Sequence, residues 1–208
     1  MKNVFLIGDS IRLGYESKLR ELLGDDVTVY APEENCRFTK FALWGIHWWW
    51  ENMGCPHIDV AHFNAGIWDL HRCTGDGQPF TLPDEYGCEI GRLGRRLQLI
   101  ADQVIFANII PGGAGLDEVQ KINALENSDS NFTKVCLTLP EREWNADVLR
   151  YNEIAELEMA KCGIPVNDLH SVIAADTGRF IGADGIHPTP DGYAALAEKC
   201  AFEIRKYL

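Results

Sequence analysis

The sequence predicts one α/β domain built on a mostly parallel sheet of five strands. Short apolar runs alternate along the chain with longer segments in which apolar residues recur at helical spacing. Such alternation is typical of helices that connect parallel strands. The chain has 208 residues, of which 46% are hydrophobic, and we expect residues 1–208 to form a single domain with one core.

The first strand, helix and strand are expected within the N-terminal 30 residues. Residues 4–7 are an apolar run typical of a buried strand. In residues 11–23 the leucines share one face of a predicted helix, which stops at Gly24. Residues 27–30 are the second predicted strand. Because the first apolar run is too short for a signal-peptide core or a membrane span, we expect a cytoplasmic protein.

The middle of the chain adds a helix, a strand and a long loop. Residues 38–52 are predicted as a helix that starts near Thr39, and residues 59–64 as the third strand. The loop that follows is rich in glycine and proline and extends to Pro83. Loops at strand ends often carry function, so this loop suits a site.

The pattern then becomes less regular toward residue 140. A helix over residues 84–101, whose glycines weaken the helical signal, leads to a fourth strand at residues 103–108. From residue 110 to residue 140 the apolar residues follow neither the spacing of a helix nor that of a strand. We interpret this region as a lid or as an insertion at an interface.

Two helices and a strand complete the predicted fold. Apolar residues at helical spacing predict a helix that Gly163 closes, and residues 164–166 begin the fifth strand. Thr189 followed by Pro190 is a typical helix start, so the last helix is expected to extend from there to Leu208.

Charge and composition argue against several kinds of partner. The formal net charge is −12, which disfavours nucleic acid and anionic membranes, because binding to either depends on basic residues. The seven cysteines have no paired spacing, so we expect reduced and mostly buried thiols rather than a disulfide framework. Cysteines and histidines also lack the spacing of metal ligands, and we expect no metal.

Ser10 stands directly after the first predicted strand and is preceded by Gly8 and Asp9. In parallel sheets, ligands gather at the carboxyl ends of strands, so this position favours a catalytic serine. Ser10 could instead only cap the helix that follows, and the tripeptide alone does not decide between these roles. The roles are compatible, since a helix N-terminus also presents backbone N–H groups to a developing oxyanion.

Asp184 and His187, three residues apart near the C-terminus, could activate this serine. A serine hydroxyl is a poor nucleophile near neutral pH. In the expected geometry, the carboxylate accepts a hydrogen bond from one imidazole nitrogen, and the other nitrogen takes the serine proton. An isolated pair of this kind more often shapes a turn, but its combination with Gly8-Asp9-Ser10 favours catalysis.

These two blocks resemble the first and last blocks of the SGNH (GDSL) hydrolase superfamily. The resemblance implies a flavodoxin-like, three-layer α/β/α sandwich. It also implies a catalytic triad of Ser10, His187 and Asp184, and no cofactor. The GxSxG elbow of α/β-hydrolases is absent from the sequence.

The middle blocks depart from the pattern of that superfamily. Trp68 stands where its oxyanion asparagine is expected, and Asn64 is the nearest substitute. The stretch from Asn64 to Arg72 resembles the variant block of PC-esterase-type branches, in which an asparagine precedes a Trp-Asp pair. We therefore expect the Asn64 side chain and the Ser10 N–H to donate to the oxyanion. Asn64 could instead only end a strand by bonding to local backbone.

Further residues are candidates for contact with a substrate. They are Asp9, Arg37, Trp68 and Asp69. A backbone N–H near Cys36 or Arg37 would replace the second-block glycine of the superfamily. Arg12 and Arg37 could hold an anionic group, although solvated arginines paired with acids are the commoner case.

Four tryptophans crowd the second predicted helix, at positions 44, 48, 49 and 50. Indole faces can stack on sugars. Four rings at these spacings cannot share one helix face, so some must be exposed or lie at an interface. We favour core and subunit contacts over a sugar site.

The sequence thus predicts a serine esterase that hydrolyses small acyl esters, with O-acetyl esters of sugars as the first choice. Its partners would be that ester substrate, such as an acylated carbohydrate, and a second copy of the chain. Two alternatives stay open. The same triad could transfer an acyl group to another alcohol, or the departures in the middle blocks could leave a ligand-binding module with weak catalysis.

Overall fold

A computed structural model describes residues 1–118 and 138–208 of the chain and contains a parallel sheet of five strands. The strand order is β2-β1-β3-β4-β5, and each neighbouring pair is parallel. The strands are Lys2–Ile7 (β1), Val27–Tyr30 (β2), Ile58–Phe63 (β3), Ala101–Ala107 (β4) and Val166–Asn167 (β5). The predicted α/β fold with a central five-stranded parallel sheet is confirmed.

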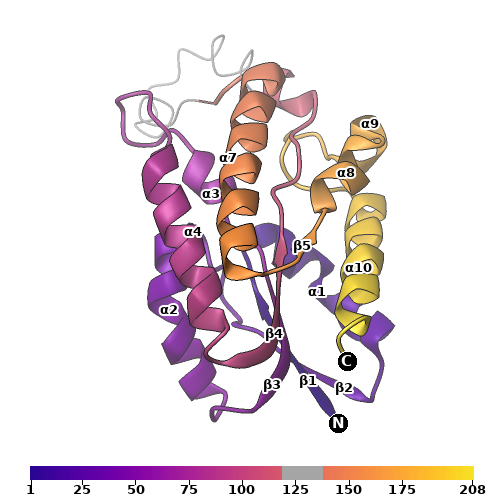
Figure 1. The fold of residues 1–208 in the computed structure, drawn as a ribbon. Coiled ribbons are helices and arrows are strands. Elements are labelled where there is room, and N and C mark those ends of the chain that lie inside the picture. The colour runs from indigo at the N-terminus through magenta and orange to yellow at the C-terminus, as the bar shows by residue number, and fades with distance from the viewer. Residues whose placement is uncertain (119–137) are drawn as a thin grey trace.

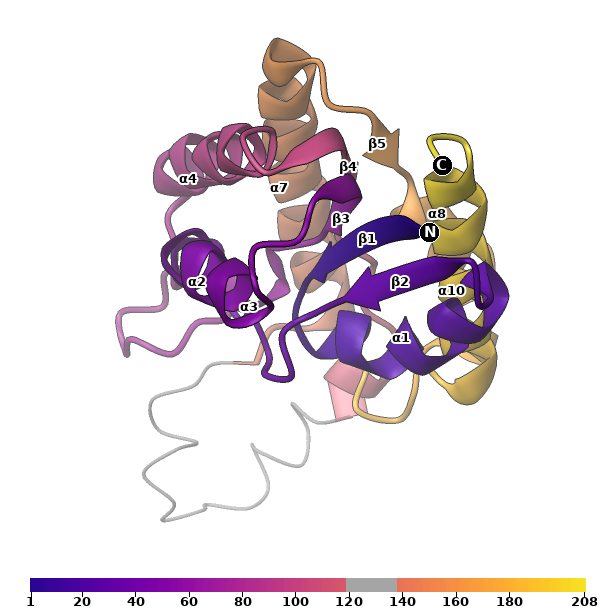
Figure 2. The ribbon, with the colours of Figure 1, turned by 90° about the horizontal axis from the view of Figure 1, so that it is seen from below.

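Helices cover both faces of the sheet and make the three layers. The helices are Ser10–Leu23 (α1), Thr39–Asn52 (α2), Ile67–Leu70 (α3), Pro83–Leu97 (α4), Glu141–Cys162 (α7), Leu169–Ala174 (α8), Thr177–Phe180 (α9) and Pro190–Arg205 (α10). Helices α2, α4 and α7 lie on one face, and α1 and α10 lie on the other (Figures 1 and 2). The three-layer α/β/α sandwich is therefore also confirmed.

The central strands are apolar because they are buried on both faces. The side chains from Val4 to Ile7 in β1 have no solvent exposure, and most of β3 and β4 is equally buried. Ile7 pairs with Phe63, which in turn pairs with Phe106. This register brings the residues that follow β1, β3 and β4 to the same edge of the sheet. Ser10, Asn64 and Asn108 come from these three strand ends.

The helix predicted over residues 84–101 ends earlier than expected. Helix α4 stops at Leu97, and the chain turns through Gln98 and the exposed Leu99 before β4 begins. The reason is the sheet register, which pairs Ala101 with Ile58 of β3. A residue in that ladder must be extended, so sheet pairing overrides the local helical pattern.

The expectation that the cysteines are mostly buried is wrong for the described residues. Cys36 and Cys200 are buried, but Cys55 and Cys88 are exposed. Cys55 lies in the turn after α2 with a φ of 52°, and Cys88 lies on the solvent side of α4. The tryptophans divide as expected, because Trp49 is in the core whereas Trp44 and Trp48 are exposed.

Three short helices were not predicted: α3, α8 and α9. Of the region interpreted as a lid or interface insertion, residues 119–137 lie outside the described residues, so that interpretation stays a prediction. Within the described parts of the chain, no helix has both the length and the apolar character needed to cross a membrane.

Candidate active site

Ser10 is the first residue of α1 and follows β1 after a two-residue turn. The N-cap of this helix is Asp9, whose Oδ1 accepts a hydrogen bond from the Ile11 N–H at 2.9 Å. Because Asp9 supplies the cap, the helix start does not need the Ser10 hydroxyl. The alternative that Ser10 serves only as the helix cap is therefore wrong.

The structure brings Ser10, His187 and Asp184 into one chain of hydrogen bonds. Nε2 of His187 lies 3.0 Å from Oγ of Ser10, although 177 residues separate them in sequence. Nδ1 of His187 lies 2.7 Å from Oδ2 of Asp184. With Nδ1 protonated and donating to the carboxylate, Nε2 is an acceptor that faces the serine hydroxyl. This arrangement can deprotonate the serine during attack on an electrophile.

A closed turn holds Asp184 and His187 in place. Oδ1 of Asp184 accepts hydrogen bonds from the backbone N–H groups of Ile186 and His187, each at 2.9 Å. Burial alone would raise the pKa of Asp184, but these bonds and the His187 side chain lower it below its usual value. The Asp184 and His187 side chains are 52% and 46% exposed, so both are open to water.

A glycine-rich segment after β4 packs against this turn. The Gly113 N–H donates to the Gly185 carbonyl at 2.9 Å. A Cβ on Gly115 would lie 2.3 Å from the carbonyl oxygen of Ala183, closer than any side chain could fit. Gly185 has a φ of 77°, in the left-handed region that favours glycine. These residues position the turn that carries Asp184, a role that was not predicted. The glycine run directly after a predicted strand was the available signal.

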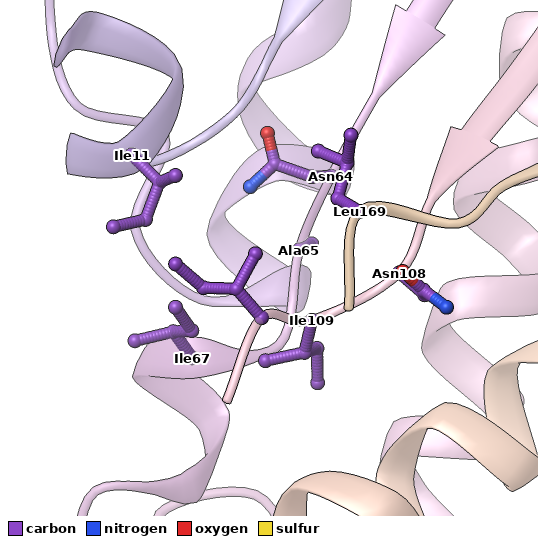
Figure 3. A pocket seen from close by; sticks show the side chains of 8 residues that line it. Ile11, Asn64, Ala65, Ile67, Asn108, Ile109 and Leu169 are labelled. Carbon is purple, nitrogen blue, oxygen red and sulfur yellow. The ribbon is translucent and has the colours of Figure 1, made fainter. Parts of the chain in front are cut away.

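Asn64 directly follows β3 and lies beside the turn that precedes Ser10. Its backbone N–H donates to the Ile7 carbonyl at 3.0 Å, which continues the pairing of β3 with β1. Its side chain extends toward α1 (Figure 3), where Nδ2 lies 3.4 Å from Oδ1 of Asp9. A Cβ at Gly8 would lie 2.2 Å from Oδ1 of Asn64. Glycine at position 8 therefore allows the Asn64 amide to approach the serine turn.

The backbone amides expected to replace the second-block glycine are both engaged inside the protein. The Cys36 N–H donates to the Gly8 carbonyl at 3.1 Å. The Arg37 N–H donates to Oδ1 of Asn35 at 2.7 Å. The prediction of an oxyanion donor at Cys36 or Arg37 is thus wrong for this arrangement, because each N–H already has an acceptor.

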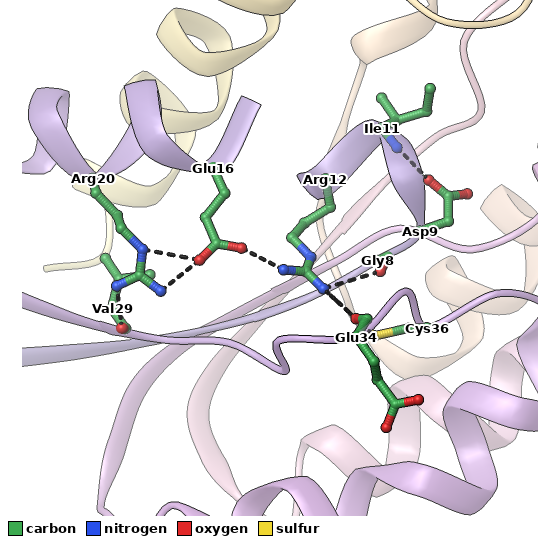
Figure 4. Close-up of polar contacts among 9 residues, drawn as sticks. All are labelled: Gly8, Asp9, Ile11, Arg12, Glu16, Arg20, Val29, Glu34 and Cys36. Carbon is green, nitrogen blue, oxygen red and sulfur yellow. Dashed lines mark hydrogen bonds and ion pairs between the residues drawn. The ribbon is translucent and has the colours of Figure 1, made fainter. Parts of the chain in front are cut away.

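Arg12 is part of the buried support of the serine turn rather than a solvated side chain. Its guanidinium is paired with Glu16 and donates to the carbonyls of Glu34 at 2.9 Å and Gly8 at 3.5 Å (Figure 4). Only 1% of Arg12 is exposed. The expected pairing with an acid is present, but burial removes Arg12 from contact with a substrate.

Two of the four candidate substrate contacts are buried. Asp9 and Asp69 are 1% and 0% exposed. The Asp69 carboxylate accepts from the N–H of Thr39 at 3.0 Å and from its hydroxyl at 2.9 Å, so it anchors the start of α2. Burial raises the pKa of Asp69 to about 6. Arg37 is exposed and covers the Phe41 ring, and Trp68 is 36% exposed. These last two side chains alone remain accessible among the four.

A small aromatic cluster lies next to His187. His71 stacks on Trp68 with ring centroids 5.9 Å apart and meets Trp144 edge-on at 5.6 Å. Burial lowers the pKa of His71, and the nearby His187 lowers it further. A neutral His71 adds no positive charge beside the base. Neither His71 nor Trp144 was predicted as part of the site.

The cavity beside Asn64 is too small for a substrate. It is lined mainly by apolar side chains, among them Ile11, Ile67 and Ile109 (Figure 3), and its volume is about 10 Å³. This is close to the space that one water molecule needs. A substrate must therefore reach Ser10 from its solvent side, where the His187 side chain is 46% exposed.

Within residues 1–118 and 138–208, one group of potential metal ligands lies close together, namely His57, Asp59 and Asp102. It is at the amino ends of β3 and β4, opposite the edge that carries Ser10. Asp59 already accepts from Lys2 Nζ at 2.8 Å and from the Asn3 N–H at 2.7 Å. His57 and Asp102 pair at 3.1 Å. These contacts account for the three side chains, and we assign no metal to them.

Comparison with known proteins finds no match by sequence, neither to a protein-family model nor to a curated protein. Solved structures do match. A lipase/acylhydrolase from Enterococcus faecalis is 18% identical with a TM-score of 0.72, and the match covers 99% of this chain and 96% of that one. A putative SGNH hydrolase from Slackia heliotrinireducens is 18% identical with a TM-score of 0.67, and the match covers 98% of each chain. An acetyl xylan esterase from Geobacillus stearothermophilus is 14% identical with a TM-score of 0.68, and the match covers 98% of this chain and 94% of that one. At these identities the likeness shows a shared fold over nearly the whole chain.

Proposed function

We propose that this chain, which has the fold of the SGNH hydrolases, is a serine esterase that cleaves small acyl esters. The observation that carries the proposal is the pair of hydrogen bonds joining Ser10 to His187 and His187 to Asp184. All three side chains reach solvent, so core packing does not require their alignment. A fold alone would not support an activity, since one fold serves many functions, but this constellation is the working part of serine hydrolases.

In the first step, Ser10 would form an acyl-enzyme. Nε2 of His187 takes the hydroxyl proton while Oγ attacks the carbonyl carbon of the ester. The carbonyl oxygen becomes an oxyanion, for which the Ser10 N–H and Nδ2 of Asn64 are the proposed donors. When the C–O bond to the alcohol breaks, the imidazolium of His187 returns its proton to the leaving oxygen. Asp184 stays charged and stabilises that imidazolium.

In the second step, water would release the acid. His187 takes a proton from a water molecule, which attacks the acyl carbon, and the bond to Ser10 Oγ breaks as the serine regains its proton. The exposure of Asp184 and His187, 52% and 46%, favours water as the acceptor over another alcohol. We therefore place hydrolysis ahead of acyl transfer.

The proposed substrate is an O-acetyl ester of a carbohydrate. The cavity beside Asn64 holds only about 10 Å³, which leaves no room there for a long acyl chain. Trp68 is 36% exposed and stacks on His71, which is close to His187, so a sugar ring could rest on its indole. Two of the solved structures with this fold are named as acetyl xylan esterases, which supports the same substrate class.

Turnover of p-nitrophenyl esters and of acetylated xylo-oligosaccharides tests the proposal. We expect release of acetate from p-nitrophenyl acetate and from the acetylated xylo-oligosaccharides, and slower turnover of p-nitrophenyl octanoate. The Ser10→Ala variant should lose activity on all three substrates. Adding a sugar alcohol as acceptor separates hydrolysis from transfer by its products. Folded wild-type protein with no more turnover than Ser10→Ala would reject the esterase and favour a binding module.

A further inference from the structure

Helix α2 exposes a stripe of four residues that no described element covers. Lys40, Trp44, Trp48 and Glu51 follow one another at spacings of four, four and three, so they lie on one side of the helix. Trp44 is 62% exposed and Trp48 is 50% exposed. The opposite side of α2, with Ala42, Ile46 and Trp49, faces the core. Adjacent exposed indoles form a contiguous apolar patch, and such patches mark contact sites more often than isolated exposed side chains do.

The rings in this stripe are arranged as a packed cluster. Trp44 and Trp48 have centroids 6.2 Å apart and planes inclined by 43°. Phe41 and Trp44 are also 6.2 Å apart, with an inclination of 37°. Tilted rings do not present a row of coplanar faces on which successive sugar units could stack. An uneven apolar surface of this kind suits the side chains of another protein.

The charges at the ends of the stripe indicate that the partner protein is a second copy of this chain. Lys40 is at the N-terminal end of α2 and Glu51 is at the C-terminal end. Both the charged pair and the tryptophan pair are centred close to Gly45 and Ile46. A second α2, placed antiparallel across a two-fold axis at that point, would bring Lys40 beside the partner's Glu51 at both ends. Trp44 would meet the partner's Trp48 at the centre, as an isologous interface requires.

We propose that the chain forms a homodimer in which two α2 helices pack antiparallel through this stripe. Lys40 binds Glu89 at 2.8 Å within its own chain, and its ammonium has further protons to donate. Within the described residues Glu51 has no ion-pair partner of its own. A net charge of −12 on each chain opposes self-association, because the two chains repel each other. The proposed interface offsets this repulsion with an apolar centre and with a pair of opposite charges at each end. The dimer does not depend on the esterase activity.

Sedimentation equilibrium over a range of protein concentrations tests the apolar centre. We expect wild type to reach twice the mass of one chain. Trp44→Ser with Trp48→Ser should raise the dissociation constant by about 30-fold or more, the effect of a hot-spot residue. Phe202→Ser is the matched control, since Phe202 is 62% exposed on α10, away from α2. Wild type that stays a single chain throughout, or a dimer that the double variant leaves unchanged, would overturn the proposal.

A charge reversal tests the antiparallel arrangement. Glu51→Lys would place two lysines together at each end and should weaken the dimer by about tenfold. Glu198→Lys makes the same change in net charge at an exposed position on α10 and should not weaken it. Equal effects of the two reversals would contradict this interface. So would a monomeric wild type that binds insoluble xylan only when Trp44 and Trp48 are present, because the occupant would then be carbohydrate.

Discussion

Two carboxyl groups flank Ser10 in very different environments. Asp184 is 52% exposed, accepts hydrogen bonds from two backbone N–H groups and His187, and has a lowered pKa. Asp9 is 1% exposed, and burial raises its pKa despite its bonds to the Ile11 N–H and Asn64. Asp184 thus keeps its charge beside His187, whereas Asp9 holds the turn that precedes Ser10.

The difference extends to how each side of the site is built. The proton-transfer side is a short turn in which Asp184 and His187 are three residues apart and open to water. The side that carries Asn64, the proposed oxyanion donor, is buried and joins segments far apart in sequence, since Asn64 is 55 residues from Asp9. We therefore expect changes to the exposed Asp184 and His187 side chains to reduce activity alone, and changes to the buried contacts that hold either side in place to reduce activity and stability together.

The largest effect is expected on the exposed side. His187→Ala should lower kcat/KM for p-nitrophenyl acetate by about 10⁴-fold or more, because the serine loses its base. The thermal midpoint should stay within a few degrees of wild type. Adding Ser10→Ala to His187→Ala should cause little further loss, since the two residues act as a unit. A full additive loss in the double variant would contradict the shared role.

A smaller effect on activity is expected at Asn64. Asn64→Ala should lower kcat by about 10²- to 10³-fold with little change in KM, because the oxyanion donor acts in the transition state. Asn108→Ala is the matched control, since Asn108 is a buried asparagine after the neighbouring strand β4. It binds Asp168 and the His170 N–H and should lower stability without a comparable loss of kcat. Similar kcat values for both variants would remove Asn64 from the oxyanion site.

The contact between the glycine-rich segment and the Asp184 turn gives a third test. Gly115→Ala forces its Cβ against the Ala183 carbonyl and should cost about 1–3 kcal/mol in the free energy of unfolding. Activity should fall about tenfold as the turn shifts. Gly178→Ala is the control, because its Cβ would meet only the Asp176 side chain, at 3.6 Å. It should leave stability and kcat unchanged. A neutral Gly115→Ala would show that the turn does not depend on this contact.

The smallest expected effect is the contribution of buried His62, two residues before Asn64, to stability. His62 of β3 has no solvent exposure, and burial lowers its pKa from 6.5 to about 4. The neutral form is thus favoured by folding, so this stability is fully present above pH 6.5 and is lost as the pH falls toward 4. The loss approaches about 1.4 kcal/mol per pH unit within that window.

Urea unfolding of His62→Gln and wild type at a series of pH values measures this contribution. The difference in unfolding free energy between the two proteins should narrow as the pH falls below 6.5. Only wild type has a buried histidine that stays neutral in the folded state while it becomes protonated in the unfolded state. Asp69, whose raised pKa acts in the opposite direction over part of this range, is present in both proteins and cancels. A difference that does not change with pH would contradict the shifted pKa of His62.

The fold was predictable because burial leaves a direct mark on sequence. The strand with Val4 to Ile7 is apolar throughout since helices cover both its faces, and Thr189 with Pro190 marks the start of α10 through local capping chemistry. Helix α4 ended early for a reason that lies in another strand, at Ile58. Local patterns therefore predicted the elements, while pairing with distant residues determined their ends.

For the site, the same division holds. Ser10, Asp184 and His187 stood out because their residue types and spacing imply proton transfer, and the structure places them in contact. The burial of Arg12 and the engaged amides of Cys36 and Arg37 depend on how the β2–α2 connection packs against the serine turn. Spacing along the chain carries little information about such contacts.

Reaction with a fluorophosphonate, followed by mass spectrometry of intact protein and of its peptides, tests the central claim most directly. The reagent phosphonylates a serine that a neighbouring base has activated, with loss of fluoride. We predict one adduct per chain, located on Ser10, and a rate at least about 100-fold lower in His187→Ala. Folded wild-type protein without an adduct on Ser10, or labelled at the same rate when His187 is alanine, would contradict an activated serine.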